Sequence, residues 1–574
     1  MKKRVLPLLL ALVMIVSIVL PMTVSAAGEE AKITIVPPSS LTIAAGDFTA
    51  YKLFDLSVSV SGITGETNYA YVPTADVAGF LASAFNPEVA GVKTYGTTPK
   101  AFKEYLEGIL TDAELKALTK NIKDYGLFST AGTVKQSGTV ENPGKNVEIS
   151  GLDYGYYLIV GEGSAPGKTS NVKVIAYSNL VTVEKAETEI KLKADAPTID
   201  KFVWDHNKTE ADKWAKWTDV NIGDTVNFKH TTKVPNMQGY DNYTFIVHDI
   251  MSAGLSFNND VAIKVGGVDV PKTHFVVTTA PNAGGTKIEI TFIDFYNSYK
   301  SKVTDAERAI EITYSAELNA GAVIAAPGNP NTVWLQYSND PYDTTWTPGI
   351  PGTPGTPGDP GNPDDPGTPG TPGTPGTPGK TGETPEDVVV VYTFKLDIYK
   401  YTGTLSTASE EALKNAQFNL KSGAVNIKFV DLDPTNGGTY RVATPAEITA
   451  ATNITEALKS PTSGQIRITG LDAGTYTLAE IAAPAGFNAL EYDLILKISH
   501  NGSGVLNPVN IKKSVGDDPA VDSTVVNVYN GTGSELPGTG GMGVTIFYII
   551  SGILTAALVG FFVVMKKRNA LKSK

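Results

Sequence analysis

The sequence predicts an all-β protein made of tandem immunoglobulin-like or Greek-key β-sandwich domains, the first with a helical insertion, followed by a C-terminal transmembrane helix. Short runs of alternating apolar and polar residues, separated by turn-forming residues, predict strands through most of the 574 residues. A Gly-Leu-Asp motif occurs at residue 151 and again at residue 470, so we expect the first and last domains to be related. By usual domain size, this length predicts three or four domains.

Both ends of the chain carry an apolar segment. Residues 1–26 combine three basic residues, an apolar run and a small-residue cleavage site, as a secretory signal peptide does. Residues 544–565 carry no charge, and as a helix they would span roughly 33 Å, enough for one bilayer crossing. The basic tail, residues 566–574, is expected to stay in the cytoplasm. The two ends predict export followed by retention at the surface.

The first domain is expected at residues 27–194 and combines strands with helices. Residues 32–35, 50–54 and 171–175 read as strands. Residues 75–85 and 99–125 contain helix formers with apolar residues near helical spacing, and we expect them to brace the sandwich.

A second domain is expected at residues 195–345, where period-two alternation at residues 222–228 and 244–251 indicates a β-sandwich. A Pro/Gly/Thr-rich linker follows at residues 346–387, with glycine at nearly every third position. A collagen triple helix needs that period but also needs three chains. We therefore expect a stiff polyproline II spacer with a reach on the order of 100 Å.

The last domain is expected at residues 388–532, and its first strand carries an inward lysine. Side chains alternate across a strand, so Lys400 shares a face with Phe394, Leu396 and Ile398. On the last strand, Asn530 shares the face of the valines at 526 and 528 by the same count. Burial favours the neutral amine of a lysine, which is a nucleophile, and an asparagine amide is an electrophile for it.

Three segments of the chain resemble Gram-positive surface proteins. Leu536-Pro537-Gly538-Thr539-Gly540, followed by an apolar run and basic residues, resembles the cell-wall sorting signal. Residues 195–345, with their Lys201 start and Tyr-Ser-Asn end, resemble the isopeptide-forming fimbrial domain of backbone pilins. Residues 388–532, with Glu480 before Ala-Pro-Ala-Gly-Phe, resemble the B-type repeat of collagen adhesins.

The resemblance implies roles for individual residues. In the last domain it implies a Lys-Asn isopeptide bond between Lys400 and Asn530, promoted by the buried acid Glu480. In the second domain it implies Lys201 as nucleophile, Asp249 as acid and Asn339 as electrophile. Asn331 lies on the same strand face as Asn339, so alternation leaves it as an alternative.

The sorting signal implies that a sortase attacks the carbonyl of Thr539 and passes the acyl group to an amine. Backbone pilins usually place the accepting lysine at the end of the first domain, in a Val-Tyr-Pro-Lys-Asn-like segment that this chain lacks. Alignment of Ile190 to Asp195 with that segment puts Lys193 on the acceptor position, with Lys191 or Lys185 as alternatives.

Lys52 also faces a predicted sheet interior, and Glu162 lies shortly after the repeated Gly-Leu-Asp motif of the first domain. We considered this pair for a third bond but assign none to the first domain. The net charge of −12 argues against nucleic acid as a partner, and an exported chain with no cysteine must take any covalent staple from other chemistry. The histidines show no metal spacing, and no catalytic motif is present, so we expect no metal, no cofactor and no enzyme beyond autocatalytic bond formation.

These observations predict a structural subunit of a pilus that is secreted and anchored to the cell wall. The expected partners are pilus-specific and housekeeping sortases, identical subunits in a covalent polymer and peptidoglycan, with accessory tip or base pilins and host surface molecules as further candidates. The alternative is a monomeric wall-anchored adhesin that binds a host matrix protein or glycan. Detergent-resistant polymers would distinguish the two.

Overall fold

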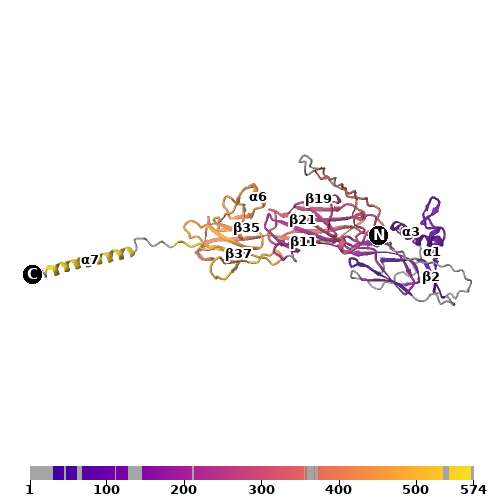
Figure 1. The fold of residues 1–574 in the computed structure, drawn as a ribbon, viewed down its shortest axis with the longest axis horizontal. Helices are drawn as coiled ribbons and strands as arrows, with labels where there is room; N and C mark the ends of the chain where they lie inside the picture. The colour runs from indigo at the N-terminus through magenta and orange to yellow at the C-terminus, as the bar shows by residue number, and fades with distance from the viewer. Residues whose placement is uncertain are drawn as a thin grey trace. The chain divides into compact units, whose positions relative to one another are not determined.

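The structure is a computed structural model that describes residues 30–43, 47–60, 67–109, 111–126, 145–209, 213–353, 356–357, 367–368, 371, 373–533 and 542–570. The chain divides into two compact units (Figure 1). The first comprises Met1–Thr393 with Gly502–Gly504, and the second comprises Phe394–Asn501 with Val505–Lys574. The predicted first and second domains therefore belong to one unit.

The N-terminal domain of the first unit pairs strands from distant parts of its sequence. One sheet has the order β10-β1-β6, with bounds Glu187–Lys191, Ala31–Val36 and Val147–Leu152. The other has the order β3-β2-β7-β8, with β9 also paired to β7. The bounds of these strands are Thr67–Pro73, Phe48–Val60, Gly155–Ala165, Val172–Ile175 and Asn179–Val183. The strands predicted at residues 32–35, 50–54 and 171–175 are confirmed.

The predicted helical insertion lies between β3 and β6 and contains α1 (Ala75–Ala82), α2 (Pro99–Gly108) and α3 (Asp112–Tyr125), with a small hairpin of β4 (Glu88–Val89) and β5 (Val92–Lys93). The helical stretch expected over residues 99–125 forms two helices. The second begins at a capping box, in which the Thr111 hydroxyl accepts from the Glu114 N–H and the Glu114 carboxylate accepts from Thr111.

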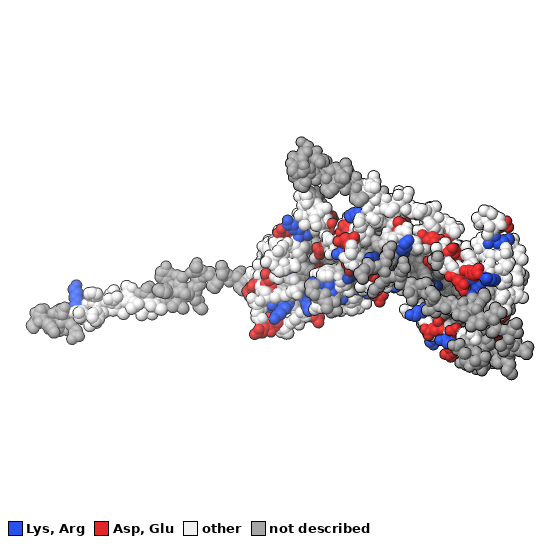
Figure 2. Space-filling model, turned by 45° about the vertical axis from the view of Figure 1, so that its right-hand side comes forward, with Lys and Arg blue, Asp and Glu red and all other residues white. Residues whose placement is uncertain are grey.

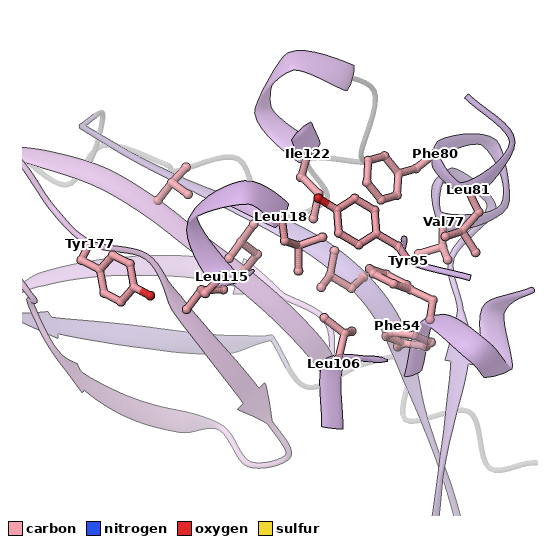
Figure 3. Close-up of a cluster of buried hydrophobic side chains, with 14 residues drawn as sticks. Phe54, Val77, Phe80, Leu81, Tyr95, Leu106, Leu115, Leu118, Ile122 and Tyr177 are labelled. Atoms are coloured by element: carbon pink, nitrogen blue, oxygen red, sulfur yellow. The ribbon is translucent and has the colours of Figure 1, made fainter. Parts of the chain in front are cut away.

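The insertion shares one core with the larger sheet. Figure 3 shows Phe80 and Leu81 of α1, Leu106 of α2 and Leu118 of α3 gathered over the strand that carries Phe54. This arrangement confirms that the helices brace the sheet, because their apolar side chains pack in one cluster with those of its strands.

The middle domain consists of two facing sheets. The first has the order β12-β11-β14-β21-β17-β18, with β16 also paired to β21. Its bounds are Trp214–Ala215, Ile199–Trp204, Thr225–Lys233, Ala309–Leu318, Ala262–Val265, Val268–Asp269 and Leu255–Phe257. The second has the order β13-β26-β22-β15-β20-β19, with β25 also paired to β22. Its bounds are Trp217–Asp219, Asp387–Tyr392, Asn329–Ser338, Phe245–Met251, Gly285–Phe292, Phe275–Asn282 and Thr381–Glu383. The short helices are a 3-10 turn at Lys272–His274, α4 (Phe295–Tyr299) and α5 (Asp305–Arg308).

The Pro/Gly/Thr-rich segment folds back on itself, so the prediction of an extended spacer between domains is wrong. Thr353 pairs with Thr371, and Ile350 exchanges two backbone hydrogen bonds of 2.8 Å with Thr374. The short strands β23 (Thr356–Pro357) and β24 (Gly367–Thr368) pair farther out. At the base, β25 pairs with the end of β22, so the segment leaves and re-enters one sheet.

The strand after this hairpin corrects a domain boundary. We expected the last domain to begin at residue 388, but β26 pairs with β22 and with β13 of the middle domain. The second unit begins at Phe394. The apolar sequence of β26, Val388-Val389-Val390-Val391, belongs to the middle-domain sheet and does not begin the core of the second unit.

The second unit is a sandwich of two sheets. One has the order β28-β27-β35-β32-β31-β33, with β40 paired to β27. Its bounds are Glu411–Ala412, Phe394–Thr402, Gln465–Leu471, Thr439–Val442, Phe429–Asp431, Ile454–Thr455 and Val526–Tyr529. The other has the order β30-β29-β36-β37-β38-β39, with β34 paired to β29. Its bounds are Val425–Asn426, Gln417–Ser422, Gly474–Ala482, Leu494–Ile498, Val509–Lys513, Val521–Ser523 and Leu458–Lys459. One short helix, α6, spans Pro445–Ala450.

The repeated Gly-Leu-Asp motif has the same structure in both units. Gly151 and Gly470 have φ values of 73° and 86°, which an L side chain rarely adopts. Four residues after each aspartate, a tyrosine in the next strand donates its hydroxyl back to the aspartate carbonyl: Tyr157 to Asp153 at 2.6 Å and Tyr476 to Asp472 at 2.9 Å. The predicted relation between the first and last domains is thus visible in their turns.

The C-terminal helix α7 runs from Met542 to Ala570 and covers the residues predicted to cross the membrane. Within the described part of the chain, however, no helix is both long and apolar enough to span a bilayer.

On the visible face of the rest of the molecule, acidic and basic side chains lie interspersed among uncharged ones (Figure 2).

Candidate crosslinking sites

The second unit brings together the three residues predicted to form a crosslink. The first strand β27 carries Lys400, and the last strand β40 runs parallel beside it, with Lys400 opposite Val528. Asn530 follows β40 directly, and its backbone N–H donates to the Tyr401 carbonyl at 3.1 Å. Burial alternates along both strands, which confirms that Lys400 points inward.

Within this site the Lys400 amine contacts the side-chain amide of Asn530, and it lies 3.6 Å from a carboxylate oxygen of Glu480. The Asn530 Nδ2 donates to both oxygens of Glu480, at 3.0 and 3.2 Å. The backbone N–H of Leu490 donates to Glu480 Oε2 at 2.8 Å and holds the carboxyl in place. The side chains of Lys400 and Glu480 are fully buried.

The electrostatics of this site favour a nucleophilic amine. Burial lowers the pKa of Lys400 to about 8, although the neighbouring Glu480 opposes the shift. Glu480 contacts both reacting groups, so it can take a proton from the amine and give one to the leaving amide nitrogen. The arrangement can therefore join Lys400 to Asn530 with release of ammonia.

The middle domain contains a second buried lysine site. Lys201 on β11 and Asp249 on β15 come from opposite sheets, and their side chains are fully buried and in contact. His230 on β14 lies opposite Lys201 in the register, and its Nε2 is 3.1 Å from the Lys201 amine and 3.0 Å from Asp249 Oδ2. The amine also donates to the Tyr314 hydroxyl of β21 at 2.6 Å.

The asparagine at this site is Asn331 and not Asn339. The Asn331 side chain is fully buried, and its Nδ2 donates to the Tyr314 hydroxyl at 2.9 Å. Asn339 instead lies beyond the end of β22, where its side chain donates to the Lys173 carbonyl of the N-terminal domain at 2.9 Å. The first choice from sequence is therefore corrected to its alternative, because Asn331 is buried within β22, whereas Asn339 lies beyond the end of that strand.

Burial dominates the titration of this second site. It lowers the pKa of Lys201 to about 8 and the pKa of His230 to about 4, so the imidazole is neutral near pH 7. Burial alone would raise the pKa of Asp249, but contact with Lys201 and His230 brings it below its usual value. Because Lys201 and Asp249 touch, transfer of one proton between them produces the neutral amine and the protonated acid.

Sequence reasoning missed His230 and Tyr314. Both occupy inward positions in strands with clear period-two burial, beside Phe228 on β14 and Ile312 on β21. A polar residue on the apolar face of a predicted strand was the signal that could have found them.

Lys52 in the N-terminal domain has no asparagine partner in the described part of the chain. Its amine pairs with Asp55 at 2.5 Å and with Asp153 at 3.3 Å. Glu162, which we considered as its acid, pairs with Lys173 at 2.5 Å. This site therefore holds an ion-paired lysine and offers no amide to attack.

The three lysines considered as acceptors differ in exposure. Lys193 is half-buried with its amine 5.4 Å from the centre of the Tyr177 ring, and burial lowers its pKa. Lys191 ends β10 and is exposed, as is Lys185 before that strand. The sorting motif, Leu536 to Gly540, lies outside the described residues.

Comparison with protein families identifies two of these segments. Residues 222–341 match the sequence profile of the Gram-positive pilin backbone subunit 2, Cna-B-like domain, and residues 404–512 match that of the SpaA prealbumin-like fold domain. One segment of the chain is thus similar to a domain of Gram-positive pilin backbone subunits, and the two matched segments together cover less than half of the chain. These matches agree with the prediction of a structural pilus subunit at the Gram-positive cell surface.

Solved pilin structures align with most of this chain at low identity. The T6 backbone pilin of serotype M6 Streptococcus pyogenes is 16% identical, with 88% of this chain and 99% of that chain covered and a TM-score of 0.44. BcpA, the major pilin subunit of Bacillus cereus, is 13% identical over 88% and 100%, with a TM-score of 0.38. The Corynebacterium diphtheriae major pilin SpaA is 14% identical over 87% and 99%, with a TM-score of 0.38. A comparison with curated proteins finds no match.

Proposed function

We propose that this protein is a backbone pilin, the repeating subunit of a covalent fibre, and carries two internal Lys-Asn isopeptide bonds. The observation that carries the proposal is the contact between the buried Lys400 amine and the Asn530 amide, with Glu480 touching both. A lysine buried without compensation is costly, so its presence in two sandwich cores calls for a chemical reason. The second bond would join Lys201 to Asn331, with Asp249 as acid.

The positions of the bonds suit a fibre under tension. Lys400 lies on the first strand of the second unit and Asn530 directly follows its last strand. A bond between them would carry force from one end of the unit to the other without loading the hydrogen bonds of the strands between. In the middle domain, a bond from β11 to β22 would join the two facing sheets.

Polymerisation requires a donor and an acceptor. The proposed donor is the Thr539 carbonyl, released from Gly540 by a pilus-specific sortase, and a housekeeping sortase would finally attach the fibre to peptidoglycan. The proposed acceptor is Lys193, with Lys191 as alternative. The lowered pKa of Lys193 favours a nucleophilic amine, whereas the exposure of Lys191 favours access by an enzyme.

Two measurements test this function. The full chain should weigh less than its calculated mass by two molecules of ammonia, one for each Lys-Asn bond, and an unreduced mass would reject the internal bonds. Wall extracts boiled in detergent should give a ladder of polymers. Its absence would favour the monomeric adhesin.

Sequencing of crosslinked peptides from the ladder identifies the acceptor. Thr539 joined to Lys193 supports the primary assignment, and Thr539 joined to Lys191 or Lys185 moves it. Polymers that persist when all three lysines are replaced by arginine would reject an acceptor at the end of the first domain.

A further inference from the structure

Tyr314 is the common neighbour of all three groups that react in the middle domain. Its hydroxyl oxygen accepts from the Lys201 amine at 2.6 Å and from the Asn331 Nδ2 at 2.9 Å, and the hydroxyl donates to Asp249 Oδ2 at 2.6 Å. The site is closed to solvent, since Lys201, Asp249 and Asn331 are each fully buried.

The acid of this site does not reach the amide directly. All hydrogen bonds of Asp249 within the described residues use Oδ2 and go to Lys201, His230 and Tyr314, while Asp249 Oδ1 has no partner. The Asn331 amide has one hydrogen-bond partner within the described residues, the Tyr314 hydroxyl, and its Oδ1 has none.

In the second unit the acid contacts the amide directly, without a tyrosine between them. There the acid is Glu480, one methylene longer than an aspartate, and both of its oxygens accept from the Asn530 amide nitrogen at 3.0 and 3.2 Å. The longer side chain spans from amine to amide by itself. In the middle domain the shorter acid leaves a gap, and the Tyr314 hydroxyl fills it.

We propose that Tyr314 is a catalytic residue for the Lys201–Asn331 crosslink, relaying a proton from Asp249 to the departing amide nitrogen; this rests on the proposed bond at that site. Lys201 first gives one proton to Asp249. The neutral amine then attacks the Asn331 side-chain carbonyl carbon, forms the new C–N bond and gives a tetrahedral intermediate.

Collapse of that intermediate breaks the bond to Nδ2. The Tyr314 hydroxyl gives its proton to Nδ2 and takes the proton that Asp249 holds. Neutral ammonia then departs, and the new amide nitrogen loses its second proton to Asp249. The lysine ammonium and the asparagine amide become a secondary amide and ammonia, Tyr314 ends in the state in which it began, and Asp249 keeps the proton that the lysine ammonium lost.

The surroundings of Tyr314 suit a relay that stays neutral. Burial and the adjacent Asp249 raise the pKa of its hydroxyl well above the usual value, so a free phenolate does not accumulate. Simultaneous gain and loss of a proton avoids that charge. His230 acts as a positioning residue, because its Nε2 contacts both the Lys201 amine and Asp249.

The test replaces the hydroxyl alone. Tyr314→Phe keeps the ring that stacks on Phe228 at a centroid distance of 5.3 Å, but it removes the relay. Tyr337→Phe is the matched control, since Tyr337 is also buried in the same domain and its hydroxyl has no hydrogen-bond partner among the residues that the structure describes. The full chain is made by cell-free synthesis, and the crosslinked peptide containing Lys201 and Asn331 is measured by mass spectrometry over time.

We expect Tyr314→Phe to form this bond at least about 100-fold more slowly than the wild type, as loss of a general acid-base group does. Tyr337→Phe and the Lys400–Asn530 bond should keep wild-type rates. Formation of the bond at the wild-type rate in Tyr314→Phe overturns the relay. Absence of the peptide from the wild type would reject the proposed bond itself, which is a different result.

A rescue variant separates chemistry from folding. In Asp249→Glu/Tyr314→Phe the longer acid should reach the amide directly, as Glu480 does, and restore the bond. Loss of the bond in the single variant without recovery in the double variant would assign Tyr314 a packing role and overturn the relay. The same conclusion follows if Tyr314→Phe melts below Lys201→Met, which lacks the bond but keeps the tyrosine.

Discussion

Removal of the crosslink in the second unit tests the structural role of the bond with a calculable magnitude. Lys400→Met removes the nucleophile and leaves an apolar side chain of similar length in a fully buried position. The two residues that the proposed bond would join, Lys400 and Asn530, are 130 positions apart. For a loop of that length the chain-entropy relation gives about 5 kcal/mol of stabilisation at 25 °C, through restriction of the unfolded chain.

In a domain of this size, a loss of about 5 kcal/mol corresponds to a fall in melting temperature on the order of 10–20 °C. Differential scanning calorimetry of the full chain measures it, and intact mass verifies that one ammonia is retained. Glu480→Gln should also retain one ammonia. It should melt lower than Lys400→Met, because it leaves an unreacted amine in the core.

The reasoning would be refuted if Lys400→Met lost the crosslink by mass but kept the melting temperature of the wild type. That result would mean that the bond does not constrain the unfolded chain as the entropy argument requires. A wild-type mass without loss of ammonia would refute the bond before any calorimetry.

Three further outcomes are expected. Asn331→Ala should retain one ammonia in the full chain while Asn339→Ala loses as much as the wild type; the opposite pattern would restore the sequence-based choice. Asn530→Ala leaves Lys400 unreacted, with a folded-state pKa of about 8 against 10.5 for the ordinary amine. The unfolded chain then binds more protons between these two values, so stability to denaturant should rise from about pH 8 to pH 10.5. Lys400→Met has no amine at this position and should show no such rise. Replacement of residues 344–379 by a short turn should shift the melting temperature by only a few degrees, because β22 and β25 already meet at the hairpin base; a collapse of stability would show that the hairpin is part of the domain core.

The alternation of side chains was enough to place some site residues. Lys400 and Asn530 occupy inward positions on the first and last strands, and period two alone requires both to face one interior. The helix formers and apolar spacing of residues 75–85 and 99–125 likewise predicted helical structure, although a capping box at Thr111 begins a second helix within the latter stretch. Such features depend on neighbours in the sequence, and so they can be read from it.

Other features depended on which strands meet. Alternation gives Asn331 and Asn339 the same face, but Asn331 lies in β22 opposite Met251 of β15, whereas Asn339 lies beyond the end of the strand, so only Asn331 joins the Lys201 site. His230 and Tyr314 were inward by alternation, yet their contact with Lys201 and Asp249 arises from four strands in two sheets. The Pro/Gly/Thr repeats read as an extended spacer, while pairing of β25 with β22 turns them into a hairpin. Periodicity determines the face of a side chain, but strand register and sheet packing are contacts between distant residues, and only the tertiary structure decides them.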